Sequence, residues 1–261
     1  MTFKLDTKNL VNHFELVDLK ISQISYKDSL KYVVERAIRQ IPTYVCFANS
    51  HMLIEARYDS SFAQDVNNAN LVLADGFPLK VGIKYIHKKH QDRISGMDFL
   101  PDVMKILNFE GLNVFIIGST TDVHLALRKT ISSTYPNIKI VGCISPPFNE
   151  NWNNKSYIEL INKANTNIVL VALGCPKQEK WMAKNHKDIH ATLLGIGGAL
   201  PVFAGIAKNA PMWMKNNGLE WLFRLLLEPR RLWKRYLITN TLTLFLISKQ
   251  LLYRFFKKKN I

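Results

Sequence analysis

Six short apolar runs recur along the 261-residue chain, and they restrict its fold more than any other feature. The runs are TYVCFA (43–48), LVLA (71–74), NVFIIGS (113–119), IKIVG (138–142), NIVLVALG (167–174) and ATLLGIGG (191–198). Each has the length of a β-strand, and several are apolar throughout instead of alternating with polar residues. Continuous apolar runs are typical of strands that are buried on both faces of a parallel sheet.

The segments between these runs have the length and character of helices. Candidate helices span Ser50–Asn67, Thr121–Tyr135, Lys155–Ala164 and Lys177–His186. Strands that alternate with helices indicate an α/β protein in which helices cover both faces of a mostly parallel sheet. The sequence therefore predicts a doubly wound α/β fold.

Polar and glycine residues follow most of the predicted strands. These strand ends are NSH (49–51), DG (75–76), GST (118–120), GCPKQ (174–178) and GIGG (195–198). In open α/β sheets, ligands bind beyond the carboxyl ends of the strands. We therefore expect a binding site along this edge.

Asp75 and Gly76 end the second run, and this dipeptide is also a common turn signal. A hairpin would need an alternating strand directly afterwards. The next residues are instead FPLKVGIKYI (77–86), which favour a helix with Pro78 in its first turn. We therefore expect Asp75 at the binding edge of the sheet, with a plain capping or turn role as the alternative.

The formal net charge of +15 is concentrated near the C-terminus. Residues 214–261 contain eleven lysines and arginines but only two acids, which accounts for +9 of the total. Leucine and tryptophan recur there at helical spacing, and the uncharged run 236–248 has 13 residues. A membrane span needs roughly 20 residues, so we expect a basic amphipathic helix that lies on an anionic membrane. A helix packed on the body or in an oligomer interface is the alternative.

The cysteines and the N-terminus fit a reducing cytosol. Cys46, Cys143 and Cys175 are scattered without a CxxC motif, so neither structural disulfides nor a zinc ribbon is expected. The segment MTFKLDTKNLVNHFEL (1–16) lacks the apolar core of a signal peptide.

The common phosphate-binding signatures are absent or incomplete. The chain has no P-loop, and GIGGAL (195–200) carries Leu200 where a dinucleotide fingerprint needs its third glycine. The strand-to-helix segment 118–122 could hold a phosphate on backbone N–H groups, although a plain Ser/Thr N-cap explains it equally. Asp-x-Asp, the carboxylate pair expected where a divalent ion holds a nucleotide diphosphate, does not occur. A phosphate site here would depend on backbone amides and cationic side chains.

Taken together, these motifs resemble the WecG/TagA/CpsF family of bacterial glycosyltransferases. The matching pieces are FANSHM (47–52), ADGFPL (74–79), RISGMDFL (93–100), NVFIIGS (113–119), SPPF (145–148), ALGCPKQEKWM (172–182), GIGGAL (195–200) and GLEWLFRLLLEPRRLWKRY (218–236). They follow the order of the family across residues 45–236. Singly they are modest, but the combination of ADG, GxPKQE and EWLxRLxxEPRR is highly specific.

The resemblance implies a Rossmann-like core at residues 1–213 and a basic helical appendage at 214–261. The appendage would meet the inner face of the cytoplasmic membrane. The implied reaction is inverting transfer from a UDP-sugar to an undecaprenyl-diphosphate-linked saccharide, without a metal or other cofactor. TagA members transfer N-acetylmannosamine in teichoic acid linkage units, and WecG members use N-acetylmannosaminuronic acid. Nucleic acid is not an implied partner, and a homo-oligomer is compatible with the resemblance.

The resemblance also assigns roles to three residues at the strand edge. Asp75 matches the catalytic base, which would remove the proton of the acceptor hydroxyl as the new bond forms. Arg93 matches a residue that stabilises diphosphate charge in place of a metal, with an exposed ion pair to Asp92 as the alternative. Asn49 matches a pocket residue near the donor sugar.

Further residues match positions that bind substrate. Gln178 would touch the donor or acceptor, with a helix-capping role as the alternative. The glycine turn after the last strand would let the nucleotide approach the backbone, and appendage arginines would close on the lipid diphosphate or the leaving UDP. These residues are Gly118, Gly195, Gly197 and Gly198, and Arg224, Arg231 and Arg235.

Two departures from the family pattern leave the donor open. Pro201 stands where members often carry an acid, and Asn209 stands where they often carry an arginine. Two other functional classes remain as alternatives. One is a Rossmann oxidoreductase, against which the incomplete glycine fingerprint counts. The other is a non-enzymatic module whose basic tail binds lipid or nucleic acid.

Overall fold

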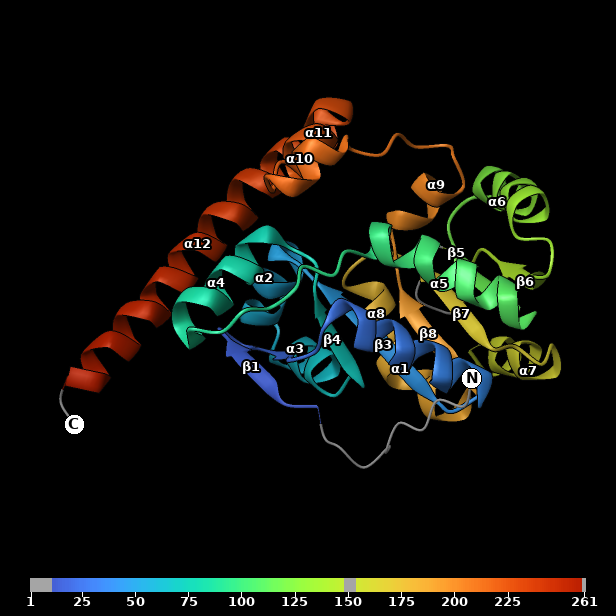
Figure 1. Cartoon of the computed structure of the whole chain (residues 1–261), viewed down its shortest axis with the longest axis horizontal. Helices are drawn as coiled ribbons and strands as arrows, with labels where there is room; N and C mark the ends of the chain where they lie inside the picture. The colour runs from blue at the N-terminus through green and yellow to red at the C-terminus, as the bar shows by residue number, and fades with distance from the viewer. Residues whose placement is uncertain (1–10, 148–153, 260–261) are drawn as a thin grey trace.

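The centre of the molecule is a six-stranded parallel sheet with the strand order β4-β3-β8-β7-β5-β6 (Figure 1). The computed structural model describes residues 11–147 and 154–259, so Phe148 of the SPPF motif and the outer ends of both expected domains lie outside the described part. The strands are β3 (Thr43–Ala48), β4 (Leu71–Ala74), β5 (Asn113–Gly118), β6 (Lys139–Ile144), β7 (Ile168–Ala172) and β8 (Thr192–Gly195). All six predicted strands and the doubly wound α/β class are confirmed.

Side chains on each strand alternate between two separate apolar cores. In β3, Tyr44 and Cys46 belong to one core, whereas Val45 and Phe47 belong to the other. The first core lies under α2 (Ser50–Tyr58), α3 (Ser60–Asn67), α4 (Phe77–His87), α7 (Asn154–Lys163) and α8 (Lys177–Asn185), and the second under α1 (Tyr26–Ile38), α5 (Gly96–Glu110), α6 (Thr121–Thr134) and α9 (Ala199–Phe203). Burial on both faces explains why these strands are continuously apolar in sequence.

The predicted helix Ser50–Asn67 is two helices, and Asp59 is the reason. Asp59 ends α2 with extended backbone, and its carboxylate accepts a hydrogen bond from the Phe62 N–H at 3.0 Å. An acid at an N-cap satisfies the first free N–H groups of a new helix, so α3 begins directly after it.

Besides the short helix α9, three segments were missing from the sequence prediction. A two-stranded antiparallel hairpin, β1 (His13–Leu16) and β2 (Leu19–Ser22), packs on the first core. The other two are the helices α1 and α5 on the opposite face. Each of these helices begins after a serine whose side chain accepts a backbone hydrogen bond, Ser25 for α1 and Ser95 for α5.

The C-terminal segment forms α10 (Met212–Asn216), α11 (Glu220–Leu227) and the long helix α12 (Pro229–Lys259). Figure 1 shows α12 lying along α2 and α4, with α10 and α11 at its upper end. The buried residues Leu232, Thr239, Thr243 and Ile247 recur at seven- and four-residue spacing, so they form one stripe on the helix. The predicted amphipathic helix is therefore present, and one of its sides is packed on the body.

Gly82 allows α12 to approach α4 closely. A Cβ at Gly82 would lie 2.9 Å from Cδ1 of Ile247. Farther along α12, the Gln250 side chain accepts a hydrogen bond from the Val17 N–H at 2.9 Å and donates one to the Glu15 carbonyl at 3.1 Å. Residues 11–147 and 154–259 contain no helix that is both long and apolar enough to cross a membrane.

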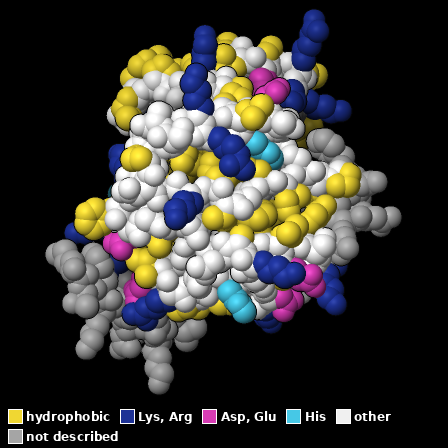
Figure 2. Space-filling model, turned by 90° about the vertical axis from the view of Figure 1, so that its right-hand side faces the viewer, with side chains coloured by type: hydrophobic (Ala, Val, Ile, Leu, Met, Phe, Trp, Pro, Cys, Tyr) yellow, Lys and Arg dark blue, Asp and Glu magenta, His cyan; other side chains and the backbone are white. Residues whose placement is uncertain are grey.

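The opposite end of the molecule, which Figure 2 faces, carries α6, β6 and α7. Lysine and arginine side chains stand apart from one another over most of this face, between short strips of hydrophobic side chains. The edge strand β6 is only partly covered. The charge on this face is dispersed, in contrast to the concentrated charge of the C-terminal segment.

Gly118 has no side chain and so allows β5 and β7 to lie close together at the binding edge. Its replacement tests the packing there. Gly118 has a φ of +92°, and an added Cβ would lie 2.4 Å from the Ala172 carbonyl oxygen. We expect Gly118→Ala to destabilise the protein by about 2–5 kcal/mol, because backbone overlap adds to the cost of a positive φ. Thermal or urea unfolding measures this loss.

Gly174→Ala is the matched control for this substitution. Gly174 also has a positive φ, of +80°, but an added Cβ there meets no atom within 4 Å. We expect this variant to lose only about 1–2 kcal/mol, the conformational cost alone. Equal losses in the two variants would contradict the close approach at Gly118.

Candidate active site

Asp75 and Asn49 follow neighbouring strands and lie side by side at the carboxyl edge of the sheet. Ala74 of β4 pairs with Ala48 of β3, and the Asp75 N–H continues the ladder by donating to the Ala48 carbonyl at 2.8 Å. Gly76, and not Asp75, is the N-cap of α4, and no side chain caps that helix. The simple capping role for the Asp75 carboxylate is therefore not observed.

Asn49 is the N-cap of α2. Its Oδ1 accepts hydrogen bonds from the backbone N–H groups of His51, at 3.0 Å, and Met52, at 3.2 Å. A Cβ added to Gly76 would lie 3.5 Å from Cα of Asn49, so the two loops are closely packed. The cap fixes Asn49 beside Asp75, which keeps it a candidate for donor binding at this edge.

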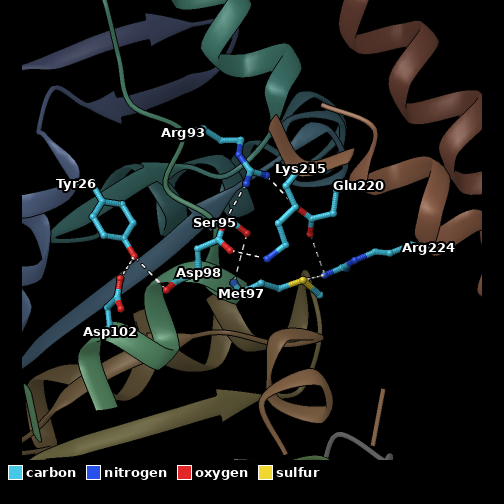
Figure 3. Close-up of polar contacts among 9 residues, drawn as sticks. All are labelled: Tyr26, Arg93, Ser95, Met97, Asp98, Asp102, Lys215, Glu220 and Arg224. Atoms are coloured by element: carbon cyan, nitrogen blue, oxygen red, sulfur yellow. Dashed lines mark hydrogen bonds and ion pairs between the residues drawn. The ribbon is translucent and has the colours of Figure 1, made fainter. Parts of the chain in front are cut away.

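A chain of ion pairs crosses from the core to the C-terminal segment close to Asp75 (Figure 3). Arg93 donates to Oδ2 of Asp98 and to Oε2 of Glu220, both at 2.9 Å. Lys215 donates to the other oxygen of Asp98 at 2.7 Å, and Arg224 lies 3.7 Å from the other oxygen of Glu220. Three cations thus share two carboxylates.

The alternative role for Arg93, an exposed ion pair with Asp92, is not observed. The Arg93 side chain is only 16% exposed. Asp92 instead accepts hydrogen bonds from the Tyr26 N–H and from the His90 ring. Arg93 is therefore directed toward the Asp75 edge of the sheet by Asp98 and Glu220.

The surroundings of Asp75 favour its protonated form. Burial is the largest cause, followed by the Glu220 carboxylate, and together they raise the pKa of Asp75 to about 7. The charges of Arg224 and Arg93 and a hydrogen bond with Ser95 oppose this shift. A carboxyl group with a pKa near neutrality exchanges protons readily at physiological pH, as a general base must.

Gln178 joins the ends of β7 and β8. Its side chain is buried, with Oε1 accepting from the Gly174 N–H at 3.2 Å and Nε2 donating to the Gly195 carbonyl at 2.9 Å. Nε2 also donates to Glu179 at 2.7 Å. The structure thus shows Gln178 holding the edge in shape, and its predicted contact with substrate stays a prediction.

The glycines at the end of β8 and in the turn after it make room for these side chains. A Cβ at Gly195 would lie 2.6 Å from the Met182 methyl group, and one at Gly197 would lie 3.1 Å from Oε1 of Gln178. Gly198 brings the turn close to the appendage, because its added Cβ would lie 3.6 Å from Nη1 of Arg224. The glycine turn and Arg224 therefore belong to the same site as Asp75.

The other predicted arginines lie farther along α12. Arg235 is half-buried against the Tyr236 ring. Burial lowers the pKa of His51, and the nearby charge of Arg235 lowers it further. Arg231 is exposed and pairs with Glu228. Arg224 is therefore the only one of the three to take part in the ion-pair chain.

Gly118 is separated from Asp75 by most of the width of the sheet. Four strand spacings divide β5 from β4, which is about 19 Å. Thr120 caps α6 by accepting from the Val123 N–H, so the N-cap alternative is what the structure shows. Gly118 lies on the same edge as the site but not among the residues around Asp75.

Sequence reasoning missed four residues that complete the site. Asp98, Lys215 and Glu220 supply the ion pairs, and Ser95 bonds to Asp75. Asp98 falls inside the RISGMDFL motif, and Glu220 opens the EWLFR motif. The available sequence signal was that each of these acids shares a motif with an arginine of the site, Asp98 with Arg93 and Glu220 with Arg224.

Glu179 is a further residue of these motifs to which sequence reasoning gave no role, and it is a buried acid. Its side chain is fully buried next to Gln178, and burial raises its pKa to about 7. It accepts from Gln178 and bonds with the Cys175 thiol. Glu179 therefore orients the amide that joins β7 to β8.

Within the described ranges, no three His, Cys, Asp or Glu side chains gather as they would around a metal ion.

Comparison with known proteins gives consistent matches. The model of the Glycosyl transferase WecG/TagA/CpsF family matches residues 14–257. The N-acetylglucosaminyldiphosphoundecaprenol N-acetyl-beta-D-mannosaminyltransferase of Bacillus subtilis (strain 168) is 32% identical over 202 residues, covering 76% of this chain and 77% of that protein. The enzyme of the same name from Staphylococcus aureus (strain NCTC 8325 / PS 47) is 28% identical over 199 residues, covering 74% and 73%.

The raised pKa of Asp75 predicts how the stability of the protein changes with pH. The native protein holds a proton on Asp75 up to about pH 7, whereas the unfolded chain releases it near 3.8. This carboxyl group therefore stabilises the fold most at low pH, and its contribution is lost as pH rises through 7. We expect the melting temperature of Asp75→Asn, relative to wild type, to be higher at pH 8 than at pH 5.

The matched control replaces an exposed acid on the distant helix α7. Glu159→Gln removes one carboxylate of the same kind from the surface. Its melting temperature relative to wild type should be the same at both pH values. An Asp75→Asn variant that behaves like this control would contradict the unfavourable burial of the Asp75 charge.

Proposed function

The chain belongs to the WecG/TagA/CpsF family of glycosyltransferases, and we propose that it transfers a sugar, with inversion and without a metal, from a UDP-sugar to an undecaprenyl-diphosphate-linked saccharide. The observation that carries the proposal is the Asp75 carboxyl group at the strand edge with the guanidinium groups of Arg93 and Arg224 around it. Family membership leaves the oxidoreductase and the non-enzymatic module without support.

Asp75 acts as the base in this proposal. Its carboxylate takes the proton of the acceptor hydroxyl while the hydroxyl oxygen attacks the anomeric carbon of the donor. The bond from the anomeric carbon to the diphosphate breaks, and UDP leaves with the bonding electrons. A single displacement of this kind inverts the anomeric configuration.

The cations of the ion-pair chain take the place that a metal has in other nucleotide-sugar enzymes. Negative charge grows on the diphosphate as UDP departs, and guanidinium groups stabilise it through paired hydrogen bonds. Arg93, Arg224 and Lys215 have only two carboxylates among them, Asp98 and Glu220. An anionic substrate completes the charge balance.

The names of the relatives suggest the substrates. Those enzymes are named as N-acetylmannosaminyltransferases that act on N-acetylglucosaminyldiphosphoundecaprenol. We extend this to an N-acetylmannosamine-like donor, or another hexose, in the biosynthesis of a cell-surface polysaccharide or teichoic acid. Pro201, within α9, and Asn209, which is exposed beyond it, remain the positions at which the donor site differs from the family pattern.

The exposed side of α12 supports docking on the inner face of the cytoplasmic membrane. Opposite the buried stripe, Leu237 is 63% exposed and Phe245 is 62% exposed. Further exposed apolar side chains on α11 and α12 are Trp221, Leu226, Trp233, Leu244, Leu252, Tyr253, Phe255 and Phe256. The exposed cations on α12 include Arg230, Arg231, Lys234, Lys249 and Lys257. Apolar and basic groups on one side of a helix suit an anionic membrane surface.

A UDP-release assay tests the reaction. The purified protein receives a panel of UDP-sugars that includes N-acetylmannosamine, its uronic acid, glucose, glucuronic acid and galactose. The acceptor is a short-chain lipid-diphosphate N-acetylglucosamine, and each assay is run with and without EDTA. We expect UDP release that needs one donor and the acceptor together and that survives EDTA. UDP release that stops with EDTA would contradict the metal-free mechanism.

Asp75→Asn tests the base within the same assay. We expect turnover to fall at least about 100-fold, because positioned acid–base groups contribute about 10²–10⁴ in rate. UDP binding, measured by calorimetry, should persist because the arginines remain. An active Asp75→Asn enzyme would remove Asp75 as the base.

The membrane contact is tested with the double variant Leu237→Ser/Phe245→Ser. Because each apolar side chain contributes roughly 1.5–3 kcal/mol when buried, we expect binding to phosphatidylglycerol vesicles to weaken at least tenfold. The melting temperature should change little, since both side chains are exposed.

Phe109→Ser is the control for this double variant, because Phe109 is 85% exposed on α5, away from α12. Vesicle binding should be unchanged in the control. Unaltered vesicle binding in the double variant would contradict the proposed contact. A wild-type dimer in the absence of lipid that the double variant abolishes would assign this side of α12 to a second copy of the chain.

A further inference from the structure

Glu220 lies where the appendage meets the core, and it pairs with an arginine from each of them. It is the first residue of α11, and its side chain is 15% exposed. One carboxylate oxygen accepts from Arg93 of the core at 2.9 Å, and the other lies 3.7 Å from Arg224 of the appendage. Within the described part of the chain, it is the only carboxylate that pairs with both arginines.

The two arginines are held unequally. Arg93 lies between two carboxylates at 2.9 Å, those of Asp98 and Glu220. Arg224 is 34% exposed, its contact with Glu220 is longer, and its other contact is the Met97 sulfur at 3.2 Å. A thioether is a weak acceptor. Arg224 can therefore move to a stronger acceptor at little cost, whereas Arg93 stays in place.

The same carboxylate offsets a repulsion. Two guanidinium groups that converge on one site repel each other unless a negative charge lies between them. Asp98 is already shared between Arg93 and Lys215. While Asp75 is protonated, Glu220 is therefore the group that keeps Arg93 and Arg224 close together when no substrate is present.

We propose that Glu220 is a positioning residue, which holds Arg93 and Arg224 on either side of one carboxylate in the substrate-free enzyme and gives up Arg224 to the diphosphate of the lipid-linked acceptor. The diphosphate offers stronger, bidentate acceptors for a guanidinium than a distant carboxylate oxygen does. This inference rests on the proposed function for the identity of the ligand. The role in holding α11 against the core rests on the geometry alone.

Glu220 also influences the base. The groups that face Asp75 are Glu220 and Arg224 from α11, and Arg93 and Ser95 from the segment before α5. Of these, Glu220 raises the pKa of Asp75, and the other three lower it. Removing the charge of Glu220 should therefore let Asp75 ionise at lower pH.

The test compares Glu220→Gln, Glu220→Asp and the surface control Glu159→Gln in the full-length protein. UDP release is measured against acceptor concentration and pH. Hydrogen–deuterium exchange then reports on α11 and on the segment around Arg93 without any substrate. Glu159 lies on α7, away from the appendage (Figure 1).

We expect Glu220→Gln to raise the KM for the acceptor about tenfold, the size of one lost charge-assisted hydrogen bond, while kcat near pH 8 changes less than about threefold. In the pH profile of kcat/KM, the acidic limb should move to a pH at least about half a unit lower. Exchange should increase in α11. Glu220→Asp keeps the charge, so its acidic limb should stay close to that of wild type.

Wild-type values of KM, acidic limb and exchange in Glu220→Gln would overturn the proposal. So would a variant that only melts at lower temperature while its kinetic constants and pH profile stay normal, since that is a purely structural effect. Failure of wild type to release UDP contradicts the proposed function instead. The exchange comparison then still decides whether Glu220 holds α11, and unchanged exchange in Glu220→Gln overturns that role.

Discussion

All six strands of the large sheet run in the same direction, and the site depends on this constraint. Parallel neighbours need a crossover between them, and the crossovers are the helices that bury both faces. The carboxyl ends of the strands consequently meet at one edge. Residues that are 26 positions apart, Asn49 and Asp75, become neighbours there because Ala48 and Ala74 are paired. The polar groups of the proposed chemistry are then supplied by loops at this edge, by the first turn of α5 and by the appendage that reaches the edge.

The charges at this edge are balanced only in part. Burial makes ionisation of Asp75 unfavourable, and cations without partners would be equally unfavourable there. Lys215, Arg93 and Arg224 are offset by Asp98 and Glu220, which leaves one positive charge over while Asp75 is protonated. The arrangement is stable enough to exist without substrate but remains attractive to an anion. It also ties the appendage to the core, since Lys215 of α10 pairs with Asp98 of the core and Glu220 of α11 pairs with Arg93 of the core.

The sequence predicted the sheet well because the buried strands are continuously apolar, a pattern that no surface strand shares. It missed the hairpin β1–β2 and the helices α1 and α5, whose signals are local caps such as Ser25 and Ser95. It also merged α2 and α3, because an acid at residue 59 reads as part of a polar helix face until its capping bond is seen. Family motifs supplied Asp75 and Arg93, and the structure places them together. The partners Asp98 and Glu220 were not predicted, because the Arg93–Glu220 pair joins residues 127 positions apart and no local pattern encodes it.

The two sides of α12 connect the position of the site to the position of the proposed membrane. At 1.5 Å per residue, the 31 residues of α12 extend about 46 Å. The uncharged run within it has only 13 residues, which is too short to cross a bilayer. One side is fixed to the core through Thr243 and Ile247, so the helix cannot rotate without exposing those residues. A membrane that takes the opposite side would therefore hold the whole core in one orientation. Because α11 directly precedes α12, the same contact would also set the height of Arg224 and Glu220 above the lipid surface. The diphosphate of a polyprenyl-linked acceptor lies at that surface, where Arg224 could meet it without the lipid leaving the membrane.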